Sequence, residues 1–292
     1  MSRLFLFLKG MAMGAADLVP GVSGGTIALI AGIYEELLEA IQSVNAKALK
    51  LLLSGRWRDF WEHINGSFLA TLFAGIFTSV FLFSRLLTYL LADHPIPVWS
   101  FFFGLIIVSA YFVFPHERRI KNYAFFGLGV AAAYTISMLS AAQTPEAYWF
   151  VFLSGAIAIC AMILPGISGS FILLLLGKYA FILNALKTLD IGVIIVFGVG
   201  CVVGLLSFTR LIYWLLSHYK SITLATLAGF MIGSLGKIWP WKITIGDSYE
   251  NVAPQQYELL TGAPNLWGFA LLFFLVGALF VWLMERAGRK VS

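Results

Sequence analysis

The sequence alternates long apolar stretches with short polar connections. Six of the apolar stretches are long enough to cross the hydrocarbon core of a bilayer as helices that rise about 1.5 Å per residue. They cover residues 66–92, 97–115, 121–142, 190–216, 222–239 and 265–286. We therefore predict an all-α polytopic membrane protein.

Two further apolar regions, residues 4–33 and 147–178, are interrupted near their middle by a Pro-Gly pair and more glycine. A helix broken within lipid must lie against protein or water, so we predict that each region is a re-entrant hairpin. Residues 34–65 mix charged side chains with leucine and tryptophan, which indicates helices at the membrane interface. Residues 240–264 form the longest polar loop.

The chain contains an internal repeat. Pro20-Gly21-Val22-Ser23-Gly24 recurs 145 residues later as Pro165-Gly166-Ile167-Ser168-Gly169. Farther along, Arg85 aligns with Arg210 at an offset of 125 residues. The second copy is therefore about 20 residues shorter, and the missing residues correspond to the interfacial region.

These matches divide a single membrane domain into repeat A, residues 1–142, and repeat B, residues 143–292. Repeat A has its hairpin, the interfacial region and three spans within residues 66–142, and repeat B has its hairpin and three spans within residues 190–286. Because three crossings are an odd number, we predict that the two repeats have inverted topology.

Basic residues gather in the interfacial region, in the turn before residue 121 and in the C-terminal tail, which this topology places on one side. The positive-inside rule makes that side cytoplasmic, so both termini are predicted to lie in the cytoplasm. The turn at Asp93 and the loop 240–264 then face outward. Lys178 and Lys187 also fall on the outer side, against the rule.

Composition supports the membrane assignment and limits the chemistry. The chain is 60% apolar and 11% charged, with a mean hydropathy of +0.91, so lipid must be the solvent for most of its surface. The net charge of +5 is spread over short loops, which does not indicate nucleic-acid binding. Cys160, Cys201 and the four histidines lack metal-ligand spacing, and no metal site is predicted. Gly200-x-x-x-Gly204 predicts close helix packing.

The two breaks carry the candidate chemistry. Ser23 and Ser168 stand where each would cap a half-helix, whose free backbone N–H groups and positive dipole end attract an anion. The predicted anion-binding residues are Pro20, Gly21, Ser23, Gly24, Gly25 and Thr26 in the first break, and Pro165, Gly166, Ser168, Gly169 and Ser170 in the second. The alternative is a pair of hairpins that only pack tightly.

The segment Met13-Gly14-Ala15-Ala16-Asp17-Leu18-Val19-Pro20-Gly21-Val22-Ser23-Gly24-Gly25-Thr26, its counterpart at Pro165–Ser170, and Gly233-Ser234-Leu235 with Trp239-Pro240-Trp241 resemble the bacterial polyprenyl-phosphate transporter family. The resemblance covers nearly the whole chain. It implies translocation of undecaprenyl phosphate, the lipid carrier of cell-wall precursors, from the outer to the inner leaflet of the bacterial cytoplasmic (inner) membrane for reuse. The phosphate head would be the anion, and its polyprenyl chain would stay in the bilayer.

Four charged residues are further candidates. Arg85 and Arg210 lie inside apolar spans, where a guanidinium can bind phosphate through two parallel hydrogen bonds or extend to the nearer headgroups. Asp17 and Glu35 are candidates for coupling to a proton or a sodium ion, and Asp17 has the alternative role of a solvated cap. No other cofactor is expected.

Two other functions remain open. Membrane polyprenyl-pyrophosphate phosphatases carry a Pro-Gly-x-Ser motif and a Glu-x-x-x-Glu, and Glu35 and Glu39 have that spacing here. Those enzymes place an arginine directly after the serine, where this chain has Gly24 and Gly169, so the main electrostatic support for phosphoryl transfer is missing. The third possibility is an ion-coupled exporter of another small anion.

Overall fold

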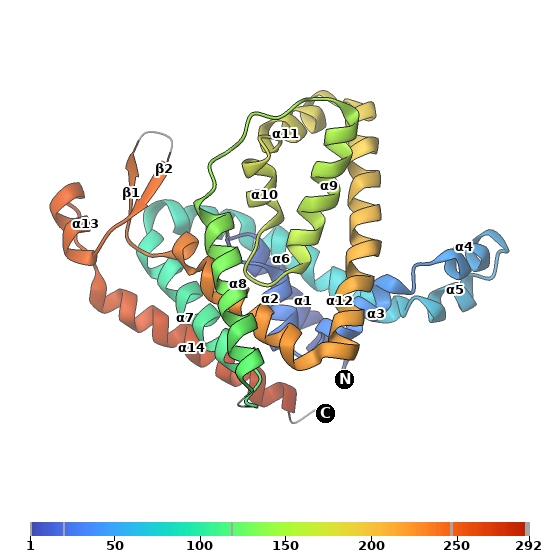
Figure 1. Ribbon diagram of the computed structural model, residues 1–292, viewed down its shortest axis with the longest axis horizontal. Coiled ribbons are helices and arrows are strands. Elements are labelled where there is room, and N and C mark those ends of the chain that lie inside the picture. The colour runs from blue at the N-terminus through green and yellow to red at the C-terminus, as the bar shows by residue number, and fades with distance from the viewer. Residues whose placement is uncertain (1, 20, 118, 246–247, 290–292) are drawn as a thin grey trace.

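The computed structural model describes residues 2–19, 21–117, 119–245 and 248–289. Figure 1 shows their arrangement. In chain order the elements are α1 (Arg3–Asp17), α2 (Gly24–Ile30), α3 (Tyr34–Gln42), α4 (Ala46–Leu53), α5 (Trp57–His63), α6 (Gly66–Asp93), α7 (Pro95–Val113), α8 (Ile120–Met138), α9 (Tyr148–Ile163), α10 (Gly169–Leu175), α11 (Tyr179–Thr188), α12 (Ile191–Gly233), the 3-10 helix η1 (Ser234–Ile238), β1 (Lys242–Ile245), β2 (Ser248–Asn251), α13 (Pro254–Thr261) and α14 (Trp267–Arg289).

Within the described residues, four helices are long and apolar enough to cross a membrane. They are α6, α7, α12 together with η1, and α14. The pair α10 and α11, bent by 104°, reaches the required length only as a unit. Helix α8 occupies the third predicted span, but it begins with the polar residues Lys121 and Asn122 and is not among the four. The chain is a multi-pass α-helical membrane protein.

The predicted spans 190–216 and 222–239 are joined in the structure by one bent helix, which corrects the expectation of a loop between them. The bend lies at Tyr219, whose φ of −133° and ψ of 42° are not helical. The polar run there has neither proline nor glycine, so helical residues continue on both sides of a single distorted one. The hydroxyl of Thr223 donates to the carbonyl oxygens of Leu215 and Tyr219, at 3.2 and 2.9 Å, and satisfies both.

Small residues bring the helices together along these spans. Helix α1 packs on α6, α7 on α14, and α8 and α9 on α12. A Cβ atom built on Gly200 would lie 2.1 Å from the carbonyl oxygen of Phe152, and one on Gly204 would lie 2.5 Å from that of Ala156. Only glycine permits this approach of α12 to α9, so the predicted packing role of Gly200-x-x-x-Gly204 is confirmed.

The two predicted hairpins approach the centre of the protein along different directions. In Figure 1, α1 runs inward from the side that holds both chain ends, whereas α9 runs inward from the side of α11. This arrangement agrees with inverted repeats. The inversion within a bilayer stays a prediction, because it depends on where the membrane lies.

The segment α4–α5, called the arm below, projects from the helical body (Figure 1). Its two helices pack on each other, and α5 contacts the start of α6. The arm exposes several large apolar side chains, namely Leu49, Leu53, Trp57 and Trp61. Such side chains are typical of a helix that lies in the interface, as predicted for residues 34–65.

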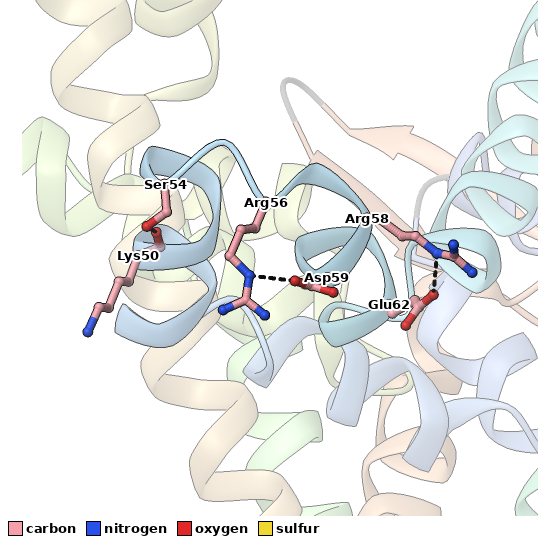
Figure 2. A network of polar contacts seen from close by, with 6 residues as sticks. All are labelled: Lys50, Ser54, Arg56, Arg58, Asp59 and Glu62. Carbon is pink, nitrogen blue, oxygen red and sulfur yellow. Dashed lines mark hydrogen bonds and ion pairs between the residues drawn. The ribbon is translucent and has the colours of Figure 1, made fainter.

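Charged side chains cover the rest of the arm. Figure 2 shows Arg56 bound to Asp59 at 2.5 Å and Arg58 bound to Glu62 at 3.2 Å, while Lys50 points away from both pairs. All four paired side chains are well exposed, so each pair stabilises the arm by less than about 1 kcal/mol. Within each pair the positive and negative charges cancel, so the excess positive charge of the arm comes from its lysines.

The region predicted as the polar loop 240–264 contains regular structure, which corrects that expectation. Strands β1 and β2 pair antiparallel, and α13 follows them. A small core of Ile96, Trp241, Val252 and Ala270 holds this region against α7 and α14. The indole of Trp241 donates to the carbonyl oxygen of Asn265 at 2.7 Å. The tryptophans therefore supply the apolar surface and hydrogen bonds that a plain loop lacks.

Labelling of single cysteines tests the predicted orientation. In a chain whose two native cysteines are replaced by alanine, Glu250→Cys places a thiol on the exposed strand β2 and Ser54→Cys places one on the exposed arm. A membrane-impermeant maleimide added to intact cells should label position 250 and not position 54. The reverse pattern would show that the positive-inside assignment is wrong.

Candidate functional site

The two Pro-Gly-x-Ser-Gly breaks have the same backbone geometry. After α1 the chain turns through Gly21 and enters α2, and after α9 it turns through Gly166 and enters α10. Both glycines have φ of +84°, a conformation that residues with a side chain rarely adopt. The repeat therefore extends from sequence to local structure.

The first break has partners within the protein for its exposed amides. The N–H of Gly24 donates to Oδ1 of Asp17 at 2.6 Å, and the N–H of Gly25 donates to Oγ of Ser23 at 3.1 Å. Ser23 in turn donates to the carbonyl oxygen of Met162 at the end of α9, at 3.0 Å. Ser23 is the predicted cap, and Asp17 acts as a second cap on the same half-helix.

Helix α1 stabilises both ends of α2. Asp17 stands at the N-terminal end of α2, and the ammonium of Lys9 donates to the carbonyl oxygen of Ala31 just beyond its C-terminal end. A negative group at the first end and a positive group at the second complement the helix dipole. Lys9 is only 6% exposed, so this bond also satisfies a charge that has little contact with solvent.

The two breaks also bind each other directly. The N–H of Gly166 donates to the hydroxyl of Thr26 at 3.2 Å, and the hydroxyl of Tyr34 donates to the carbonyl oxygen of Ile163 at 3.2 Å. Thr26 and Tyr34 are almost completely buried. Polar groups freed by one break are therefore satisfied by the other.

The second break is more open. Ser168 occupies the N-cap position of α10, but its side chain does not cap the helix as predicted. Its hydroxyl instead forms a hydrogen bond of 2.8 Å with the hydroxyl of Ser170, which is exposed. The repeat partner of Asp17 is Met162, which cannot accept a hydrogen bond from the start of α10 as Asp17 does from α2. The start of α10 thus keeps hydroxyl groups available for a ligand.

A cavity of about 300 Å³ lies where the two breaks meet. Its polar lining comes from Asp17, Ser23, Ser168, Gly169, Ser170 and Cys201. Four of the predicted anion-binding residues are in this group. The other described members, Gly21, Gly24, Gly25, Thr26, Pro165 and Gly166, belong to the packed breaks and do not line it. Pro20 lies outside the described residues.

The glycines beside the cavity are approached by protein atoms. A Cβ on Gly24 would lie 2.5 Å from a carboxylate oxygen of Asp17, one on Gly25 would lie 2.6 Å from the carbonyl oxygen of Ile163, and one on Gly169 would lie 2.7 Å from that of Ala158. The structure thus gives these glycines a packing role, in addition to the predicted role of admitting a ligand.

Four predicted residues lie away from this cavity. Arg85 and Arg210 are exposed on α6 and α12, and neither belongs to the cavity lining or forms an ion pair with a described residue. Glu35 binds Lys220 at 2.6 Å, and Glu39 accepts a hydrogen bond of 2.8 Å from Tyr213. Both glutamates therefore face α12.

The sequence interpretation missed Lys237, which η1 places next to both breaks. A Cβ on Gly21 would lie 3.3 Å from the Cβ of Lys237, and the ammonium of Lys237 lies 4.4 Å from the ring centre of Phe171 in the first turn of α10. A lysine at the end of the apolar stretch 222–239 was the signal available in the sequence. Among the described residues, no three His, Cys, Asp or Glu side chains come together as a metal site.

Fold and cavity together define a multi-pass membrane protein with two broken helical hairpins that meet at a small polar cavity. Comparison with known proteins gives its family. A model of the undecaprenyl phosphate translocase-like family matches residues 13–255, and the chain belongs to this family. A polyprenyl-phosphate transporter of Vibrio cholerae is 46% identical over 303 aligned residues, which cover 99% of this chain and 98% of the relative.

A polyprenyl-phosphate transporter of Staphylococcus aureus is 33% identical over 253 residues, covering 80% of this chain and 85% of the relative. No solved structure matches the chain. The predicted resemblance to polyprenyl-phosphate transporters is thereby confirmed.

The contact between the breaks can be tested through Thr26. Thr26→Val keeps the shape of the side chain but leaves the buried N–H of Gly166 without its acceptor, which should lower the free energy of unfolding by about 1 to 3 kcal/mol. Thr88→Val is the matched control, because the hydroxyl of Thr88 is exposed and bonds only within α6. Thermal unfolding in detergent measures both variants. Equal stability of Thr26→Val and Thr88→Val would show that the hydrogen bond between Gly166 and Thr26 does not stabilise the fold.

Proposed function

We propose that this chain moves undecaprenyl phosphate from the outer to the inner leaflet of the bacterial cytoplasmic membrane. The phosphate head passes through the cavity between the two breaks, and the polyprenyl chain remains in lipid. The observation that carries the proposal is the shared cavity, because hydroxyl groups of both repeats line one space in a protein whose relatives are named polyprenyl-phosphate transporters.

The lining suits a ligand that must be released again. Ser168 and Ser170 offer hydroxyl donors to phosphate oxygens, and no lysine or arginine lines the cavity among the described residues. A permanent cation in the cavity would hold a phosphate more strongly, since hydrogen bonds between charged partners are about twice as strong as neutral ones. Hydroxyl donors allow the head to enter from one leaflet and leave toward the other.

Asp17 gives this cavity a means of ion coupling. Its carboxylate lines the same space that the phosphate would occupy, so two negative groups would meet there. Like charges at short distance in a poorly solvated site repel strongly. A proton or a sodium ion bound at Asp17 would remove this repulsion, and its release would help to expel the phosphate. Glu35 is less suited to this role, because Lys220 already pairs with it.

The same geometry argues against the phosphatase alternative. Glu35 and Glu39 bond to residues of α12 and do not join Ser23 at the cavity. The hydroxyl of Ser23 is buried and donates to a carbonyl oxygen. Among the described residues, the Ser23 hydroxyl donates to a carbonyl oxygen and not to a base, and no lysine or arginine lines the cavity to stabilise a reacting phosphate.

Reconstituted vesicles test the proposal directly. Purified protein is inserted into vesicles that carry undecaprenyl phosphate in one leaflet. A fluorescent probe reports the phosphate headgroup, and a quencher added outside the vesicles measures how much of the lipid has moved between the leaflets. Protein should accelerate exchange relative to protein-free vesicles without releasing inorganic phosphate from undecaprenyl pyrophosphate. Phosphate release without leaflet exchange would show that the chain is a phosphatase and not a lipid transporter. Transport of small soluble anions alone would favour the exporter.

The hydroxyl pair of the second break should matter for transport. The double substitution Ser168→Ala and Ser170→Ala removes both donors from the cavity and should slow exchange by about tenfold, the effect of losing one or two hydrogen bonds to a charged ligand. Ser207→Ala is the control, since the Ser207 hydroxyl bonds only within α12. An unchanged rate in the double variant would place the phosphate path elsewhere.

Arg85 and Arg210 remain candidates for receiving the phosphate at the two membrane faces. Lysine keeps the positive charge but loses the planar fork that binds two phosphate oxygens. Arg85→Lys and Arg210→Lys should therefore lower the exchange rate while membrane insertion stays normal, as judged by the amount of folded protein recovered. Normal exchange in both variants would reduce these arginines to anchors at the headgroups.

A further inference from the structure

Lys237 and Lys242 lie together beside the two breaks. The 3-10 helix η1 packs against both turns: a Cβ on Gly21 would lie 3.3 Å from the Cβ of Lys237, and a Cβ on Gly166 would lie 2.9 Å from the hydroxyl oxygen of Ser234. The ammonium of Lys242 donates a hydrogen bond to the carbonyl oxygen of Lys237. The two lysines therefore occupy one place, at the point where η1 leads into β1.

Aromatic rings hold the two ammonium groups in position. The ammonium of Lys237 lies 4.4 Å from the ring centre of Phe171, and that of Lys242 lies 4.0 Å from the ring centre of Trp99. Phe171 belongs to α10 and Trp99 to α7. These cation–π contacts orient the charges without neutralising them.

Neither lysine has an acidic partner within the described residues. The ion pairs found there use Arg56, Arg58, Arg119 and Lys220. Both lysines are only partly exposed, and burial, together with the nearby Lys237, lowers the pKa of Lys242 to about 8. Two adjacent cations of this kind repel each other and are poorly solvated, so an anion bound between them would relieve both penalties.

The surroundings indicate that the anion belongs to a lipid. The ammonium of Lys242 lies over the ring of Trp99, and Trp239 and Trp241, which stand between the two lysines in the sequence, have ring centroids 5.5 Å apart. Tryptophans are enriched at the level of lipid headgroups, because the ring is apolar and its N–H needs a polar partner. An anion at this depth is available as the phosphate of a lipid, and a compact phosphate monoester can contact two ammonium groups at once.

We propose that Lys237 and Lys242 form a phosphate-monoester site beside the two breaks, on their predicted outer side, where the lipid head is captured before it reaches the cavity. The site rests on the proposed function for its direction, since the outward position follows from the predicted topology. Neither lysine lines the cavity. The phosphate therefore binds strongly at the two lysines and more weakly in the cavity, where hydroxyl groups are its donors.

Binding and labelling experiments with the full-length protein in nanodiscs test this site. The variants are Lys237→Gln with Lys242→Gln, the same pair changed to arginine, and Lys187→Gln as a control for loss of one exposed lysine on the same predicted side. The probes are undecaprenyl phosphate, the uncharged undecaprenol and inorganic phosphate. In the wild type, acylation of the two lysines by a soluble amine reagent is also measured by mass spectrometry, with each probe present or absent.

The glutamine pair should bind undecaprenyl phosphate about tenfold or more weakly, with binding of undecaprenol unchanged. The arginine pair and Lys187→Gln should bind as the wild type does. Undecaprenyl phosphate, and not undecaprenol, should protect Lys237 and Lys242 from acylation, a result that does not depend on how the variants fold. The proposed site would be wrong if undecaprenyl phosphate did not protect the lysines of the wild type. It would also be wrong if the glutamine pair lost affinity for undecaprenyl phosphate and undecaprenol equally.

The inorganic phosphate arm separates this site from the proposed function. If inorganic phosphate protects the lysines as well as the lipid does, while the wild type exchanges no lipid between leaflets, the anion site stands and the transport of undecaprenyl phosphate fails. If the wild type exchanges lipid but the lysines are never protected, the proposed function stands and this site is wrong.

Discussion

The structure depends on one constraint, that a helix broken in apolar surroundings must find partners for the backbone groups that it frees. An unpaired backbone group in an apolar medium costs several kcal/mol, a large part of the about 5–15 kcal/mol by which a folded protein is stable. Here the two breaks supply the partners for each other. Thr26 of the first accepts from Gly166 of the second, and Ser23 donates to the end of α9. The hairpins are therefore stable as a pair, and the place where they meet is necessarily polar.

That pairing also explains the difference between the two breaks. Asp17 and Lys9 complete the first half-helix from α1, so the first break is closed by charges of its own repeat. The second break has no such pair and exposes Ser170 beside the cavity. We therefore expect the first break to keep its conformation and the second break to supply the hydroxyl groups that bind the phosphate. In the site that we propose, the lysines of η1 and β1 bind the phosphate first, before it reaches the hydroxyl groups of the cavity.

Much of this was predictable from local sequence, because a Pro-Gly pair determines where a helix breaks whatever surrounds it. The two breaks, the long spans and the glycine contacts between α9 and α12 follow from patterns of a few residues. The continuous course of α12 through Tyr219 and the strands β1 and β2 were missed, since tertiary packing decides them. Lys237 was missed for the same reason: only the fold brings η1 against both Gly21 and Gly166. The hydrogen bond from the N–H of Gly24 to Asp17 could not be predicted either, because it depends on how the chain folds back between the two residues.

The central claim is that the phosphate head occupies the cavity shared by the two breaks. Cryo-electron microscopy of the protein in nanodiscs with undecaprenyl phosphate measures this most directly. We predict phosphate density between Ser168, Ser170 and Asp17, with the polyprenyl chain extending into the bilayer. Phosphate density only at Arg85, Arg210 or the arm, with the cavity filled by side chains, would contradict the account.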